Sequence, residues 1–422
     1  MRPLRLLPAA AVLVAVVAVV LVAGDGDEPP ERRPVPTATP EPVPTPDPGP
    51  RLDVPARGPS LAVGITEPNP NLFAPPDVLA PPPEWQRWRR ELVRMRPALY
   101  RLVVEWNKVQ PRADQPADLA VPASGCMRDK QPCAPYAGVR DQLRALAARQ
   151  RHGGWQALVV FTGTPDWVAA PPGGCREEAG TGPPRALRAY RELVARVLGL
   201  AEEVGAELRY LTPWNEPNHP YSLAPQRAAC DPDAQSRAAS AYARLARALR
   251  AEVGDDRLVL GEMAGILEPT SRATAVPEMI RELPRELVCA APVWSQHAYI
   301  GGTDPVATVK RALTDRGCGR RQAIWITETG VGPAPGGLSL ARGITSEPQG
   351  CRLLHRRLRA WHADPRLTVA AQYTMREDDL FPTGLATTDL ARARPALREW
   401  QAWGGDRAPD DPPPPAACPD GG

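Results

Sequence analysis

Short apolar runs alternate with longer amphipathic segments along most of the chain, beginning at Leu61. In one such segment a single apolar stripe is formed at helical spacing by Leu193, Val197, Leu200 and Val204. The predicted strands are residues 61–66, 98–105, 156–162, 208–214, 257–261, 292–299, 322–328 and 367–374. The predicted helices are residues 84–96, 137–151, 184–204, 235–252, 272–285, 304–316, 347–362 and 394–402.

Strict alternation of strand and helix predicts a parallel sheet joined by right-handed crossover connections. Eight such cycles fit an α/β fold of the (β/α)8 TIM-barrel type, with residues 59–405 as the barrel domain. An open, doubly wound sheet is the second interpretation. It is weakened because no glycine-rich phosphate loop follows the first predicted strand.

The predicted connections differ in length at the two ends of the strands. Helix-to-strand connections such as residues 205–207 and 254–256 are short, whereas several segments that follow strands are long and rich in Pro, Gly and aromatic residues. The long segments are residues 106–136, 163–184, 215–234 and 375–393. This asymmetry is typical of a barrel whose functional site lies at the carboxyl ends of its strands.

The N-terminus has the pattern of an export element. Arg2 and Arg5 precede an apolar run over residues 9–23, and small residues at 22–24 offer a cleavage site. We therefore expect residues 1–24 to be a signal peptide or an N-terminal membrane anchor. The folded part is then extracellular, or tethered in the cell envelope by this segment.

Composition adds a linker and excludes one class of partner. Many of the 54 prolines fall in residues 25–58, which we interpret as an extended linker, and in residues 406–422, a proline-rich tail. The formal net charge is +3, and the arginines are scattered along predicted helices. Since nucleic-acid-binding proteins carry concentrated basic surfaces, we expect no nucleic-acid partner.

The eight cysteines all lie downstream of the export element. An even number in an oxidising compartment predicts disulfides, and the absence of a Cys-x-x-Cys pair argues against a structural zinc site. Connectivity does not follow from sequence alone. Pairing neighbours in chain order gives Cys126–Cys133, Cys175–Cys230, Cys289–Cys318 and Cys351–Cys418.

Two predicted strands end in a glutamate. Glu216 follows the fourth, between an asparagine and a proline, and Glu328 ends the seventh. Strands four and seven face one another across the mouth of a closed barrel, so both carboxyls can reach one bond of a substrate. Two such carboxyls are the minimum set for cleaving a glycosidic bond. We expect burial to raise the pKa of Glu216 and keep it protonated as the acid, while Glu328 is ionised.

Neighbouring strands supply candidate partners for these carboxyls. His297 and Tyr299 are two residues apart at the end of the sixth predicted strand and therefore lie on one side of it. We expect the Tyr299 hydroxyl to hold Glu328 ionised and Arg101, on the second strand, to add a positive charge beneath it. A buried ion pair between Arg101 and Glu105 is the alternative for that arginine.

Further candidates lie at other strand ends. Trp106, Trp167 and Trp214 are placed where an indole face can stack on a sugar ring, and we expect them to contact substrate. Glu262, after the fifth strand, is a rival carboxylate, and the acidic residues 377–379 are candidates to line the mouth.

The segments Trp-Asn-Glu-Pro-Asn, His-x-Tyr and Thr-Glu-x-Gly follow one another in this order on the fourth, sixth and seventh strands. This arrangement resembles the clan A retaining glycoside hydrolases, nearest to family 39 and next to family 5, over about residues 60–403. The resemblance implies that Glu216 is the acid/base, that Glu328 is the nucleophile and that Asn215 contacts the sugar 2-hydroxyl. Strand eight of such enzymes often brings a tryptophan as a sugar platform. Residues 372–375 contain none, so we expect Tyr373 or a loop residue to take its place here.

The resemblance implies hydrolysis of a β-linked oligo- or polysaccharide by double displacement, with no cofactor and no metal. The expected partner is a carbohydrate, and we expect a monomer. Two alternatives are a carbohydrate-binding barrel without hydrolytic activity and a transglycosidase, which shares the covalent intermediate but uses a different acceptor.

Overall fold

The structure is a computed structural model that describes residues 61–128, 133–171, 181–228, 230–319, 322–332, 343–378, 382–404 and 411–419. The predicted export element and proline-rich linker lie outside these residues, as does part of the C-terminal tail. Those assignments therefore stay predictions.

Eight parallel strands form the centre of the fold, in the order β4-β3-β2-β1-β8-β7-β6-β5. They are β1 (Ala62–Thr66), β2 (Leu99–Glu105), β3 (Gln156–Thr162), β4 (Tyr210–Thr212), β5 (Val259–Met263), β6 (Val293–His297), β7 (Ala323–Thr329) and β8 (Leu367–Tyr373). The sheet closes between β4 and β5, where Leu211 forms a parallel bridge with Leu258 and its N–H donates to the Arg257 carbonyl at 2.9 Å. The predicted (β/α)8 barrel is confirmed.

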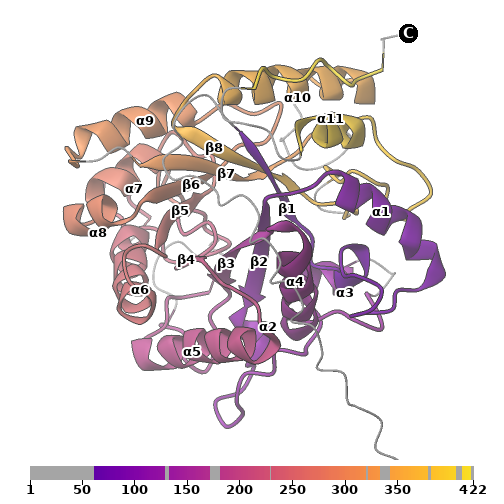
Figure 1. Ribbon diagram of the computed structural model, residues 1–422. Helices are drawn as coiled ribbons and strands as arrows, with labels where there is room; N and C mark the ends of the chain where they lie inside the picture. Colours follow the sequence, from indigo (N-terminus) through magenta and orange to yellow (C-terminus); the bar gives the residue numbers. More distant parts are fainter. Residues whose placement is uncertain are drawn as a thin grey trace, which may run out of the picture. The chain divides into compact units, whose positions relative to one another are not determined.

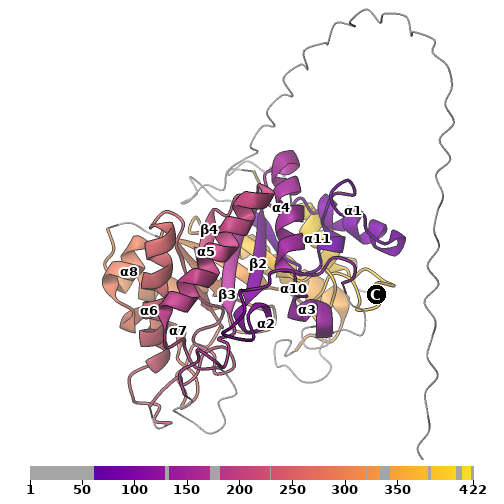
Figure 2. The same ribbon diagram turned by 90° about the horizontal axis from the view of Figure 1, so that it is seen from below.

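The helices surround the strands, as Figures 1 and 2 show from two directions. They are α1 (Gln86–Arg94), α2 (Trp106–Val109), α3 (Ser124–Arg128), α4 (Val139–Gly153), α5 (Leu187–Val204), α6 (Arg237–Val253), α7 (Val276–Glu282), α8 (Arg285–Ala290), α9 (Val306–Asp315), α10 (Glu347–His362) and α11 (Ala396–Trp403). On α5 the predicted stripe is buried at Leu193, Val197 and Leu200 and partly buried at Val204. The helix ends at Gly205, which is in the left-handed conformation.

Proline explains two of the differences between predicted and observed elements. Strand β4 stops at Thr212 rather than residue 214 because Pro213 has no N–H with which to continue the ladder. The predicted helix over residues 272–285 is two helices, α7 and α8, separated by Leu283 in an extended conformation before Pro284.

Apolar side chains from alternate strand positions fill the lower part of the barrel interior. The ring of Trp325 packs edge-on against Tyr210 with centroids 4.7 Å apart, and its Nε1 donates to Thr368 Oγ1 at 2.9 Å. Arg101 lies two residues beyond Leu99 on β2, on the same side of the strand, so polar groups begin where this apolar layer ends. The layer consists of Leu99, Leu158, Val160, Tyr210, Val259, Val293, Ala323, Trp325 and Val369.

Three of the four predicted disulfides are present: Cys126–Cys133, Cys289–Cys318 and Cys351–Cys418. The fourth pairing includes Cys175, which lies outside the described residues. The third disulfide attaches residues 411–419 to α10. Close to it, Glu399 of α11 accepts a hydrogen bond from the Ala417 N–H at 2.9 Å.

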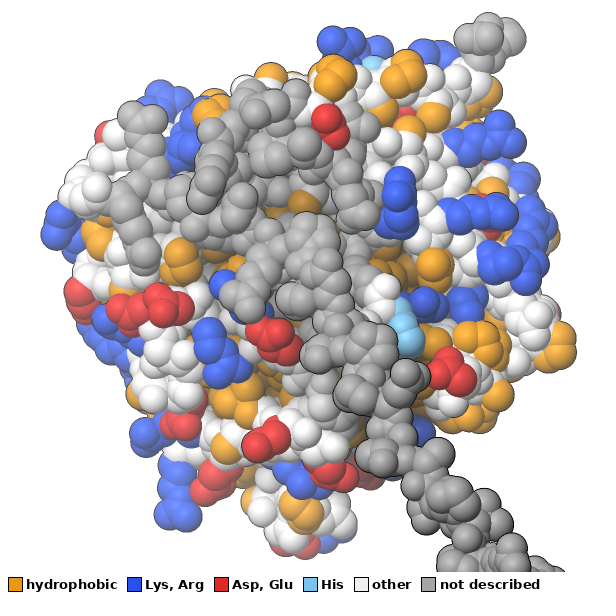
Figure 3. All heavy atoms as spheres, viewed as in Figure 1, with side chains coloured by type: hydrophobic (Ala, Val, Ile, Leu, Met, Phe, Trp, Pro, Cys, Tyr) orange, Lys and Arg blue, Asp and Glu red, His pale blue; other side chains and the backbone are white. Residues whose placement is uncertain are grey.

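Over the described residues, none of the helices is both long and apolar enough to cross a membrane. Figure 3 shows acidic and basic side chains distributed around the visible face, with a group of basic side chains where Figure 1 places the arginine-rich helix α1. Among the large apolar side chains that the structure describes, that of Tyr221 is exposed.

The interior layer predicts a large stability difference between two aromatic truncations. Trp325→Ala is expected to lower the free energy of unfolding by about 3–5 kcal/mol, because it leaves a cavity beside Tyr210. Tyr221→Ala, at a position that is 70% exposed, is expected to cost far less. Urea unfolding followed by fluorescence and circular dichroism measures both variants. Equal losses would contradict this packing.

Candidate active site

Glu216 lies just beyond β4, where the chain leaves the barrel. Its φ is +44°, which is uncommon outside glycine and marks a local constraint on the backbone. Two hydrogen bonds fix this conformation: the Glu216 N–H donates to the Glu262 carbonyl at 2.8 Å, and the Asn215 N–H donates to the Phe161 carbonyl at 2.8 Å. The Glu216 side chain is 25% exposed and can therefore meet a bound molecule.

Glu328 lies near the end of β7, and only 9% of its side chain is exposed. The Tyr299 hydroxyl donates to Oε2 at 2.8 Å, and an Arg101 nitrogen lies 2.8 Å from Oε1. Burial and the charge of Glu328 raise the pKa of Tyr299 well above its ordinary value, so this hydroxyl keeps its proton and acts as a donor. These contacts were predicted from the strand positions of Tyr299 and Arg101.

The two glutamates approach each other closely. One carboxylate oxygen of Glu216, one of Glu328 and a ring nitrogen of His297 all lie within 4.8 Å of one another. A retaining glycosidase holds its carboxyls about 5–5.5 Å apart, whereas an inverting one needs about 6.5–9.5 Å to admit a water. The spacing of these two oxygens is nearer to the first of these values.

His297 lies between two carboxylates. Its Nδ1 is 2.9 Å from Glu216 Oε1, and its Nε2 is 3.2 Å from Glu262 Oε2. Burial lowers the pKa of His297, but the charge of Glu328 and the hydrogen bonds to the other two carboxylates outweigh this effect and raise the pKa to about 10. The imidazole is therefore a cation at neutral pH.

Arg101 contacts three acceptors across the mouth. It lies 2.6 Å from Glu262 Oε2, 2.8 Å from Glu328 Oε1 and 2.7 Å from Asn215 Oδ1. The alternative pairing with Glu105 does not form, since Glu105 instead accepts a hydrogen bond from the Ser124 N–H at 2.6 Å. Burial lowers the pKa of Arg101, but the charges of Glu262 and Glu328 outweigh it and raise the pKa.

Glu262 belongs to the site, although the sequence predicted it only as an alternative to the carboxylates of Glu216 and Glu328. Val259 faces the barrel interior, so strict alternation along β5 would direct the side chain of residue 262 outward. Instead Gly261 and Glu262 have φ values of +110° and +54°, and the register with β6 shifts between Leu260 and Met263. This bulge turns the carboxylate inward. A Cβ at residue 261 would lie 2.1 Å from the Ser295 carbonyl oxygen, which explains the glycine.

Five charged groups thus form one cluster at the mouth, which we call the charge cluster: Glu216, Glu262, Glu328, Arg101 and His297. Burial raises the pKa of Glu262, but the charge of Arg101 and the hydrogen bond of His297 lower it to about 2. With three carboxylates and two cations, the cluster carries a net charge of −1.

The pKa of Glu216 differs from the prediction. Burial raises it, as expected, but the hydrogen bond and charge of His297 outweigh burial and the net shift is downward. The expectation failed because it considered burial alone and not a cation at hydrogen-bond distance.

The aromatic candidates divide into two groups. The indoles of Trp106 and Trp214 are fully buried, and their Nε1 atoms donate to Gln110 Oε1 and to the Ser222 carbonyl. A buried indole has no free face for a sugar ring, so both are packing residues and their prediction as substrate contacts is corrected.

Trp167 and Tyr373 are partly exposed. Trp167 packs edge-on against Trp106 with ring centroids 6.0 Å apart, and its Nε1 donates to the Gln110 carbonyl at 3.0 Å. Tyr373 ends β8 and interacts electrostatically with Arg101 and Tyr299. Both remain candidate substrate contacts.

Other acidic groups have structural partners. Glu377 pairs with Arg394, so this part of the acidic run after β8 is engaged in an ion pair. Cys351, Glu399 and Cys418 also lie close together, but the two sulfurs form a disulfide. In the charge cluster, a metal ion bound by Glu216, His297 and Glu328 would replace the proton on His297 and lie near Arg101.

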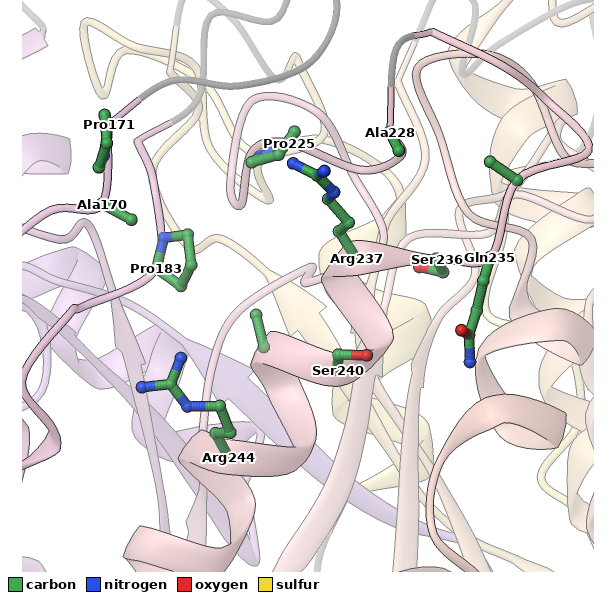
Figure 4. A pocket seen from close by; sticks show the side chains of 12 residues that line it. Ala170, Pro171, Pro183, Pro225, Ala228, Gln235, Ser236, Arg237, Ser240 and Arg244 are labelled. Atoms are coloured by element: carbon green, nitrogen blue, oxygen red, sulfur yellow. The ribbon is translucent and has the colours of Figure 1, made fainter.

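A separate pocket of about 470 Å³ lies at the start of α6, away from the charge cluster. Figure 4 shows Pro171, Pro183 and Pro225 on one side of it, with the Arg237 and Arg244 side chains extending from the helix towards them. No member of the charge cluster lines this pocket.

Comparison with solved structures identifies similar barrels. A GH30 endoxylanase from Clostridium papyrosolvens C71 is 10% identical with a TM-score of 0.53, covering 84% of this chain and 73% of that one. A GH39 β-xylosidase from Caulobacter crescentus is 16% identical with a TM-score of 0.50, covering 82% and 72%. The GH53 catalytic domain of Ignisphaera aggregans is 14% identical with a TM-score of 0.51, covering 85% and 99%.

The chain shares the (β/α)8 fold of these three proteins. At the level of fold alone, this confirms the resemblance stated from the motifs, which named family 39. No protein-family model and no curated protein matches the chain.

The raised pKa of His297 predicts a pH-dependent contribution to stability. A group whose pKa is raised from 6.5 to about 10 on folding stabilises the protein fully below pH 6.5, and this stabilisation is lost as the pH rises through 10. The stability difference between wild type and His297→Gln is therefore expected to be largest at about pH 5 and to shrink towards about pH 9. Urea unfolding at each pH measures it. His152→Gln, at an exposed position on α4, is the control, and a constant difference for His297→Gln would contradict the assignment.

Proposed function

We propose that this protein is a retaining glycoside hydrolase that cleaves an oligo- or polysaccharide. The observation that carries the proposal is the approach of Glu216 and Glu328, with one oxygen of each within 4.8 Å. The two side chains also differ in surroundings, as the two roles require. Glu328 is held by Tyr299 and Arg101, whereas Glu216 is the more exposed and shares a proton with His297.

In the first step Glu328 attacks the anomeric carbon and the glycosidic bond breaks. Glu216 supplies a proton to the departing oxygen, so that the sugar is left as an ester on Glu328. In the second step Glu216 takes a proton from water, the resulting hydroxide equivalent attacks the anomeric carbon, and Glu328 leaves as a carboxylate. No cofactor takes part in this sequence.

The residues around the two carboxyls have separate roles in this mechanism. Tyr299 and Arg101 hold the Glu328 carboxylate in place before attack, because the Tyr299 hydroxyl donates to one of its oxygens and Arg101 forms an ion pair with the other. Arg101 also holds the Asn215 carbonyl oxygen, which leaves the amide NH2 of Asn215 free to point at a sugar hydroxyl. Trp167 and Tyr373 are the aromatic groups that we propose to contact the sugar.

The proposed setting is outside the cytoplasm. Three disulfides agree with an oxidising compartment, and the N-terminal segment has the pattern of a signal peptide or an anchor. We therefore propose that the enzyme is secreted or tethered to the envelope, acts on a β-linked glycan and works as a monomer.

Removal of the nucleophile is the first test. Glu328→Gln is expected to lower kcat on the order of 10⁴-fold or more while the fold is kept, because no covalent intermediate can form. A panel of aryl glycosides and polysaccharides identifies the substrate, and circular dichroism checks folding. Glu286→Gln, which removes a carboxylate from an exposed ion pair with Arg247, is the matched control. Full activity of Glu328→Gln would refute the proposed mechanism.

The stereochemistry of the product is the second test. The first sugar released is expected to have the same anomeric configuration as the substrate, because two successive displacements restore it. Proton NMR of the reaction at early times, before mutarotation, measures this outcome. An inverted first product would show that the two carboxyls act through an intervening water instead.

A further inference from the structure

Glu262 carries a charge and has an unusual backbone conformation, but its side chain cannot reach a substrate. Its side chain is fully buried, whereas Glu216 and Glu328 both retain some exposure. A bulge with two positive φ values exists at Gly261 and Glu262, and it turns this one carboxylate into the barrel. A constraint of this kind persists only where surrounding contacts enforce it, and it is typical of functional sites. Any effect of Glu262 on chemistry must pass through its neighbours.

One oxygen of Glu262 binds both cations of the charge cluster. Oε2 lies 2.6 Å and 3.0 Å from two nitrogens of Arg101 and 3.2 Å from Nε2 of His297. Both ring nitrogens of His297 face a carboxylate, but Glu262 is fully buried whereas Glu216 is 25% exposed. Because only Glu216 can pass a proton on to a bound molecule, the contact with Glu262 holds the second proton on Nε2 in neutral His297. Nδ1 is then the nitrogen whose proton can be exchanged, and it lies 2.9 Å from Glu216 Oε1.

We propose that Glu262 is a positioning residue that fixes His297 with its Nε2 proton retained, so that His297 and Glu216 hold the catalytic proton between them. This inference rests on the proposed glycosidase function. The proton given to the leaving oxygen resides on Nδ1 in the free site and moves to Glu216 as the glycosidic bond breaks. Glu262 has no contact with the sugar in this scheme.

The charges balance at each step. Before attack the charge cluster holds three carboxylates, one guanidinium and one imidazolium. During attack Glu328 becomes a neutral ester and the Nδ1 proton leaves with the departing alcohol, through Glu216. The cluster then holds two carboxylates, Arg101 and a neutral His297, so its net charge of −1 is unchanged. In the second step water supplies the proton that returns to the pair and the hydroxyl that completes the sugar.

His297 is surrounded by charged groups from several strands. Glu216 lies beyond β4, Glu262 on β5 and Glu328 on β7, while Arg101 of β2 lies behind Glu262. Of these carboxylates, Glu262 is the one whose removal alters the imidazole without taking away a group that meets the sugar. The variant Glu262→Gln therefore tests how Glu262 acts on the His297 imidazole.

A series of leaving groups tests the proposal by kinetics. Protonation matters most for a poor leaving group and little for 2,4-dinitrophenolate, which departs unaided. Glu262→Gln is expected to lower kcat/KM about 10- to 100-fold for alkyl or methylumbelliferyl glycosides, with a much smaller loss for the 2,4-dinitrophenyl glycoside of the same sugar. An equal loss for all leaving groups would place the effect on Glu328 through Arg101 and overturn the proposal, as would no loss.

Two further variants separate positioning from folding. Glu262→Asp keeps the charge and is expected to recover part of the activity on poor leaving groups that Glu262→Gln loses. Glu278→Gln removes a carboxylate from another buried pair, 2.5 Å from Arg227, and serves as the matched control. It is expected to leave the dependence on leaving group unchanged. A selective loss in this control would assign the effect to general destabilisation instead.

NMR of ¹⁵N-labelled histidine tests the Glu262–His297 contact without a substrate. The signal of His297, assigned by its loss in His297→Gln, is expected to be that of an imidazolium at neutral pH and to titrate at lower pH in Glu262→Gln. Unchanged titration would overturn the inference. Should wild type cleave no glycoside, the proposed function would fail while this contact could still be verified, so the two failures are distinguishable.

Discussion

The burial of charge at the barrel mouth is the constraint on which the rest of the site depends. A lone buried ion is so costly that it shifts its pKa or acquires a partner, and here three carboxylates and two cations satisfy one another. Arg101 links two of the carboxylates directly, and His297 links Glu216 to Glu262. The unusual backbone at Glu216 and Glu262 exists because each carboxyl must meet these cations.

The apolar layer beneath the cluster contributes to the same constraint. Trp325, Tyr210 and their neighbours are buried and fill the barrel below Arg101 with apolar side chains. In such surroundings electrostatic interactions are stronger than at an exposed surface. Apolar packing inside the barrel therefore influences the proton affinities of the charged groups at its mouth.

Most of the fold could be predicted from sequence because strand and helix periods differ and alternate regularly. Glu216 and Glu328 could be found because each directly follows an apolar run, and Arg101 because its strand position places it below them. The inward direction of Glu262 could not, since a bulge reverses the alternation on which such predictions rely.

The tryptophans show a second limit of sequence reasoning. Trp106 and Trp214 lie at strand ends as predicted, but chain position does not determine whether a side chain turns to the mouth or to the helices. The lowered pKa of Glu216 shows a third, because it depends on a residue 81 positions away in sequence. Long-range contacts of this kind leave no local pattern.

The Cys351–Cys418 disulfide has a topological consequence for how the barrel can come apart. It closes a covalent ring over a sequence separation of 67 residues, and this ring contains β8 and α11. By restricting the unfolded chain, the ring destabilises the unfolded state by roughly 4 kcal/mol at 25 °C in the loop-closure model. Because β8 pairs with β1, the ring includes one of the two strands that join the start of the barrel to its end. The opposite joint, between β4 and β5, lies outside this ring and is held by the bridge of Leu211 with Leu258 and, nearer the mouth, by the hydrogen bond from the Glu216 N–H to the Glu262 carbonyl.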